Sequence, residues 1–152
     1  VFSLFKEMHY PASMEFIAPY MPYTAFLISV FSALRLAKFN NDTRQTSSFV
    51  GLPVPANALF WASLVTGAHD WLVSSNFHPV YLLLLVCLFS WLLVSEIPMF
   101  SLKFKNLSWK DNKTSFIFLL VCIPFLIFLG ICSFSAIIVW YILLSLITRK
   151  SK

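Results

Sequence analysis

The sequence predicts an all-α fold, a polytopic bundle of about five transmembrane helices. Of its 152 residues, 59% are hydrophobic and only 11% are charged, whereas soluble domains carry roughly 25% charged residues. The apolar residues gather in runs that polar loops separate. Because so few charges are available to cover a water-facing surface, we interpret residues 1–152 as a single integral membrane domain without a soluble part.

Five apolar runs are expected to form the spans, since a helix needs about 20 residues to cross a bilayer. They cover, approximately, residues 18–39, 56–73, 80–95, 114–130 and 135–148. Pro19 and Pro22 fall in the opening turns of the first span, where a missing amide donor costs little. Pro124 lies inside the fourth span and predicts a kink. Residues 1–5 have the character of the tail of an earlier span.

The charges support this span count. In an alternating five-span arrangement, ten of the eleven Lys and Arg residues fall on one side, and only Lys6 falls on the other. The positive-inside rule makes the richer side cytoplasmic. The net charge of +5 is thereby explained by membrane orientation, and no nucleic-acid partner is expected. Cys87, Cys122 and Cys132 show no paired spacing and are interpreted as small hydrophobic residues.

The most polar interruption is the segment 35–57, RLAKFNNDTRQTSSFVGLPVPAN, on the predicted cytoplasmic side. Arg35 and Lys38 are three residues apart, so they share one helical face. They could snorkel to the lipid headgroups as anchors. They could equally form a clamp on a phosphate or carboxylate, for which the forked donors of Arg are suited. Asn40 and Arg44 could extend such a pocket.

The second half of this segment is the turn around Gly51, Pro53 and Pro55. Glycine permits a positive φ or a close backbone approach, and the prolines stiffen the entry into the next helix. The turn therefore predicts a rigid helix start, which is compatible with a role in shaping a substrate pocket. Glu96 lies on the same side of the membrane and could pair with a cation, although the sequence names no partner for it.

Three stretches carry a resemblance to a known family: RLAKFN, DTRQTSSFVGLPVPANALFWA and SEIPMFSLKFKNL. They resemble the membrane-embedded CDP-alcohol phosphatidyltransferases, and within these most closely the bacterial enzymes that use serine as acceptor, the phosphatidylserine synthases. The similarity extends along the whole chain. The RLAKFN helix end and the FVGLPVPA loop are its most specific parts.

The resemblance implies that L-serine attacks CDP-diacylglycerol, giving phosphatidylserine and CMP in phospholipid biosynthesis. It also implies Mg²⁺ or Mn²⁺, a homodimer, and a cytoplasm-facing site in the bacterial inner membrane. The substrate-binding residues that the resemblance implies are Arg35, Lys38, Asn40, Arg44, Gly51, Pro53 and Pro55. Arg35 is the strongest candidate for a clamp on a substrate phosphate or on the serine carboxylate.

One departure from the family pattern is large. The motif D-G-x2-A-R-x8-G-x3-D-x3-D, whose aspartates hold the metals, has no counterpart, because the chain contains no Asp-Gly pair. We therefore interpret the chain as the C-terminal part of such an enzyme, with the metal ligands upstream of Val1 and with no activity on its own. Two alternatives stay open. One is another acceptor, such as glycerol phosphate or inositol phosphate, and the other is a non-catalytic scaffold or transporter component.

Overall fold

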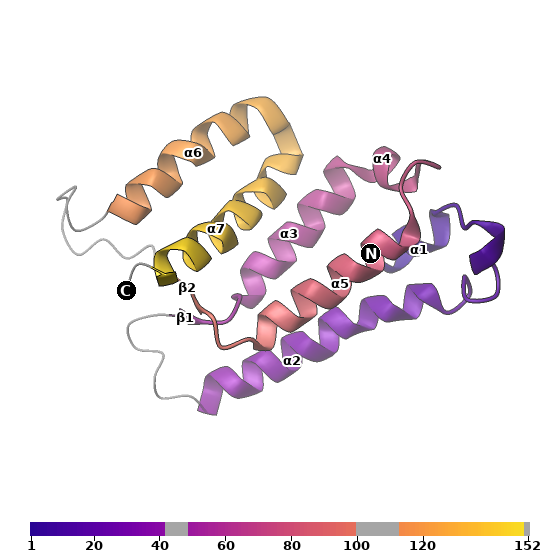
Figure 1. Ribbon diagram of the computed structural model, residues 1–152, viewed down its shortest axis with the longest axis horizontal. Coiled ribbons are helices and arrows are strands. Elements are labelled where there is room, and N and C mark those ends of the chain that lie inside the picture. Colours follow the sequence, from indigo (N-terminus) through magenta and orange to yellow (C-terminus); the bar gives the residue numbers. More distant parts are fainter. Residues whose placement is uncertain (42–48, 100–112, 151–152) are drawn as a thin grey trace.

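Helices dominate the computed structural model, which describes residues 1–41, 49–99 and 113–150 (Figure 1). The helical elements are α1 (Phe2–Glu7), η1 (Ala12–Met14), η2 (Met21–Ala25), α2 (Phe26–Asn41), α3 (Val54–Gly67), α4 (His69–Val73), α5 (Pro79–Val94), α6 (Lys113–Leu129), η3 (Gly130–Cys132) and α7 (Ser133–Lys150). The predicted helical class is confirmed. The structure adds a two-residue antiparallel ladder that was not predicted, in which β1 (Phe49–Val50) pairs with β2 (Pro98–Met99).

Two of the expected runs are not continuous α-helices. The run expected at 18–39 begins as the 3-10 helix η2, and regular α-helix starts only at Phe26. Pro19 and Pro22 explain the delay, because neither residue can donate a backbone hydrogen bond. The run expected at 56–73 is interrupted at Ala68, whose φ of −120° ends α3 before α4 begins. The helix α6 continues through Pro124.

The helices lie side by side in two groups (Figure 1). One group pairs α2 with α5, and the other packs α3 against α7 and α7 against α6. Two serines meet where α3 packs against α7. Ser135 Oγ donates to the carbonyl of Phe60 at 2.9 Å, and the hydroxyls of Ser63 and Ser135 lie 2.5 Å apart. Small and hydroxyl residues of this kind let two helix backbones approach closely, as in membrane helix pairs.

Aromatic rings join the two groups at the centre of the fold. The ring of Phe60 on α3 stacks on that of Phe89 on α5 with centroids 3.9 Å apart, and Trp61 meets Phe89 edge-on. Leu82 and Val86, on the same side of α5 as Phe89, are fully buried. This packing fixes α3 relative to α5.

Within the described residues, one helical stretch, Lys113–Thr148, is both long enough and apolar enough to cross a membrane. It comprises α6, η3 and most of α7, and the chain turns between them at Gly130, where φ is +53°. The helix α5 is also apolar but has 16 residues, or about 24 Å of helix. The five-span arrangement therefore stays a prediction.

Candidate functional site

Arg35 is the only charged side chain among the buried residues that the structure describes, with 4% of its surface exposed. It lies on α2, and its guanidinium sits over the ring of Phe39, 5.5 Å from the centroid and one turn further along the helix. Its sequence neighbours Leu34 and Leu36 are more than half exposed. The side chain of Arg35 is therefore buried in the protein, while its neighbours on either side are turned outward.

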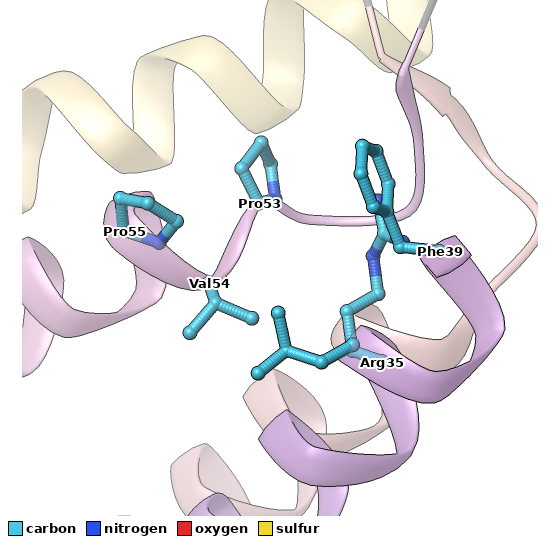
Figure 2. A pocket seen from close by; sticks show the side chains of 6 residues that line it. Arg35, Phe39, Pro53, Val54 and Pro55 are labelled. Carbon is cyan, nitrogen blue, oxygen red and sulfur yellow. The ribbon is translucent and has the colours of Figure 1, made fainter.

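Arg35 lines a cavity of about 250 Å³ between the end of α2 and the beginning of α3 (Figure 2). The described residues that line it are Arg35, Leu36 and Phe39 in the α2 wall and Pro53, Val54 and Pro55 in the α3 wall. Among these described residues, all except Arg35 are apolar. Pockets of this kind combine apolar walls with a few polar groups that orient the ligand. The chemistry matches a molecule that carries an anionic group next to an apolar part.

The α3 wall owes its shape to Gly51, which is buried and adopts a φ of +77°. A Cβ atom at this position would lie 2.7 Å from the carbonyl oxygen of Ser95 and 2.8 Å from that of Leu93. Any larger residue would thus be strained by its φ and would also collide with backbone. The amide of Gly51 donates to the carbonyl of Ile97 at 2.8 Å, and the amide of Leu52 donates to that of Leu92 at 3.0 Å.

Pro53 and Pro55 complete the turn. Pro53 is the N-cap residue of α3, with φ −63° and ψ 137°, and Pro55 is in the first helical turn. Both positions tolerate proline because the first amides of a helix have no acceptor within it. The predicted rigid helix start is therefore present, and both prolines also face the cavity (Figure 2).

Lys38 points away from the cavity. Its ammonium donates to the carbonyl of Val94 and to Oε1 of Glu96, each at 3.2 Å. Both acceptors belong to the end of α5 and the residues that follow it. Glu96 thus has the cationic partner that the sequence could not name. The side chain of Lys38 is 37% exposed and that of Glu96 is 67% exposed.

The structure brings together only part of the predicted set. Arg35, Pro53 and Pro55 line one cavity, and Gly51 supports its α3 wall. Lys38 is engaged elsewhere, and Asn40 is exposed and outside the lining. Arg44 lies outside the described residues.

Three lining residues were not predicted: Leu36, Phe39 and Val54. The position of Phe39, four residues after Arg35, could have identified it, since such pairs meet on a helix. Val54 stands between the two prolines of the turn, so its place in the wall could also have been inferred. Leu36 carries no such signal, because one side of it lines the cavity while the residue as a whole is 54% exposed.

The described residues do not fit a Mg²⁺ site. Mg²⁺ requires carboxylate, carbonyl or water oxygens in near-octahedral arrangement, and the cavity lining offers a guanidinium and apolar side chains. Within residues 1–41, 49–99 and 113–150, no group of three or more His, Cys, Asp or Glu side chains is placed to hold a metal ion. We therefore derive no chemical step through a metal from this part of the protein.

No family model, no curated protein and no solved structure matches the chain.

Proposed function

We propose that the chain forms the substrate-holding part of a membrane phosphatidyltransferase that transfers the phosphatidyl group of CDP-diacylglycerol to L-serine. The observation that carries the proposal is the cavity around Arg35. The two stretches with the most specific resemblance, RLAKFN and FVGLPVPA, supply all six of the lining residues that the structure describes. Residues that are separate in sequence but carry the same resemblance thus meet at one apolar pocket with one buried cation.

Arg35 is suited to holding a phosphate or carboxylate at this position. Its guanidinium presents forked donors that match two anionic oxygens. Because the residue is buried, the attraction is screened less than it would be in water. The apolar walls formed by Phe39, Pro53 and Val54 suit the glycerol and acyl part of a lipid substrate.

The transfer itself requires one bond to form and one to break. The serine hydroxyl oxygen bonds to the phosphorus that carries the diacylglycerol, the bond from that phosphorus to the oxygen of CMP breaks, and the hydroxyl proton leaves. Transition states of this class are stabilised mainly by positioning and by charge neutralisation. In this chain Arg35 would neutralise negative charge on the substrate oxygens.

The same proposal places the helices in a membrane, in the five-span arrangement with its basic side toward the cytoplasm. Apolar side chains on the outside of the bundle support this. On α6 the exposed apolar residues include Leu120, Ile123, Ile127 and Phe128, with 59–83% of each side chain exposed. Similar exposed residues occur on α2 and α5. Water-soluble proteins rarely expose large continuous apolar patches, whereas such patches are well solvated by lipid.

Binding of CDP-diacylglycerol by the full-length protein tests the proposal. We expect Arg35→Ala to weaken binding strongly and to lower CMP release about 100-fold, the size typical of losing one charge-stabilising donor. Arg35→Lys should recover part of the loss, since it restores charge but not the forked geometry. Lys113→Ala, which removes an exposed cation at the start of α6, is the matched control.

The outcome of this experiment separates the proposal from its alternatives. CMP release that depends on glycerol phosphate or inositol phosphate in place of serine would change the acceptor but keep the family. Equal, small effects of Arg35→Ala and Lys113→Ala would remove Arg35 from the substrate site. Failure of the wild-type protein to bind CDP-diacylglycerol would favour the scaffold or transporter alternative.

A further inference from the structure

The carboxyl end of α5 is a shared attachment point for both walls of the cavity. The last carbonyls of any helix have no donor within that helix. Here the carbonyl of Leu92 accepts from the amide of Leu52, and the carbonyl of Val94 accepts from Lys38. The backbone of Gly51 lies directly against the carbonyls of Leu93 and Ser95.

The two walls of the cavity are attached to this end of α5 by different kinds of contact. The turn that carries Pro53 and Pro55 is bound through backbone amides, and the β1–β2 ladder reinforces it. The last turns of α2, which carry Arg35 and Phe39, contact this end of α5 through the side chain of Lys38. Along its length α2 also packs beside α5 (Figure 1). The contacts of Lys38 therefore help to set the position of Arg35 relative to the prolines.

We propose that Lys38 is a positioning residue that sets the width of the Arg35 cavity, together with Glu96. Lys38 is three residues after Arg35, so both follow any movement of the last turns of α2. Its ammonium is held between the Val94 carbonyl and the Glu96 carboxylate, and it does not line the cavity. The sequence prediction made Lys38 a substrate ligand, and the contacts assign it this different role. The activity consequences rest on the proposed function, whereas the geometric role of Lys38 does not.

Substitution of Glu96 distinguishes the two roles. If Lys38 binds substrate, Glu96→Gln releases its ammonium from a competing carboxylate and should strengthen substrate binding or leave it unchanged. If Lys38 positions α2, Glu96→Gln should weaken binding in the same direction as Lys38→Met, with a smaller effect because the Val94 contact remains. The double variant should then be no worse than Lys38→Met alone.

The geometric role can be measured without any substrate. Spin labels are attached to cysteines introduced at Ala37 and Ala58, which are both exposed. The three cysteines of this chain are first replaced by alanine. The distance between the labels then reports the separation of α2 and α3 in the full-length protein in lipid nanodiscs. We expect a narrow distribution of the distance between the labels when residue 38 is the native lysine, and also in Lys38→Arg. Lys38→Met should broaden the distribution or shift it to longer distances. Lys113→Met is the control and should leave it unchanged.

The combined outcomes are decisive. A distribution that Lys38→Met leaves unchanged would overturn the proposal, and so would tighter CDP-diacylglycerol binding in Glu96→Gln. Broadening in Lys38→Met with rescue by Lys38→Arg, and about tenfold weaker binding in the broadened variant, would support it, since small misplacements of a binding group have effects of that order or larger. If the wild-type protein binds no CDP-diacylglycerol, the proposed function fails while the distance measurement still tests the role of Lys38.

Discussion

The two ends of the bundle differ in whether a charged side chain is buried there. At the cavity end, Arg35 is buried and Lys38 binds the backbone of α5. At the other end, where α1 meets α4 (Figure 1), His69 Nε2 lies 3.1 Å from Glu7 Oε2, and both side chains are about half exposed. An exposed polar contact is well solvated and adds little stability, whereas the charged group of Arg35 is withdrawn from water. Substitutions near Arg35 should therefore disturb the packing more than substitutions at the exposed contact.

The two glycines with a positive φ, Gly51 and Gly130, differ in how much space surrounds them. The turn at Gly51 leaves no space for a side chain, while at Gly130, in the α6–α7 turn, an added Cβ would meet nothing within 4 Å. Both glycines have a positive φ. Gly51 is thus constrained by close packing as well as by backbone conformation, whereas Gly130 is constrained by backbone conformation alone, so substitution of Gly51 should have the larger effect.

Gly51→Ala should have the largest effect on stability. A positive φ costs a non-glycine residue about 1–2 kcal/mol, and collision with the carbonyls of Ser95 and Leu93 adds overpacking strain of about 1–3 kcal/mol. Gly130→Ala carries only the first cost. Thermal unfolding of the full-length protein in detergent, followed by tryptophan fluorescence, measures both. Equal shifts in melting temperature for the two variants would contradict the close packing at Gly51.

Gly67→Ala should come next and would extend the comparison to the contact between α3 and η3. An alanine Cβ would lie 2.6 Å from Sγ and 2.9 Å from the backbone nitrogen of Cys132, so we expect a loss of about 1–3 kcal/mol. Adding Cys132→Ala should restore part of that stability and not all of it, because the backbone contact remains. Full recovery would show that the side chain alone limits the approach of the two helices.

Ser135→Ala should have an intermediate effect. It removes the hydrogen bond to the Phe60 carbonyl and the contact with Ser63, and a buried hydrogen bond of this type is worth about 1 kcal/mol. The loss is limited because Ser63 Oγ also donates to the Phe60 carbonyl, at 3.1 Å. Ser75→Ala, in an exposed turn, is the control, and a destabilisation no larger than that of the control would contradict the prediction.

His69→Ala should have the smallest effect, below about 1 kcal/mol, since the contact between His69 and Glu7 is exposed. Added salt should reduce the difference between variant and wild type further by screening. A loss comparable with that of Gly51→Ala would show that the two ends of the bundle are equally constrained, which would remove the basis of the comparison.

The sequence predicted the helical class and the position of the candidate site, because hydrophobic runs and turn residues are local signals. A glycine followed by two closely spaced prolines is a turn signal in any sequence, and here these residues are Gly51, Pro53 and Pro55. Arg35 is recognisable as a cation within an apolar run. The attachment of Lys38 to Val94 could not be predicted, since it joins residues 56 positions apart. The early end of α3 at Gly67 was also missed, because the apolar run continues through Ala68 without a proline.

The most direct test of the central claim is CMP release from CDP-diacylglycerol by the purified full-length protein, measured with and without L-serine and a divalent metal. We predict release only when both are present, and a loss of about 100-fold in Arg35→Ala with little change in Lys113→Ala. Serine-independent release, or full activity of Arg35→Ala, would contradict the assignment of the Arg35 cavity as the place where the activated lipid is held.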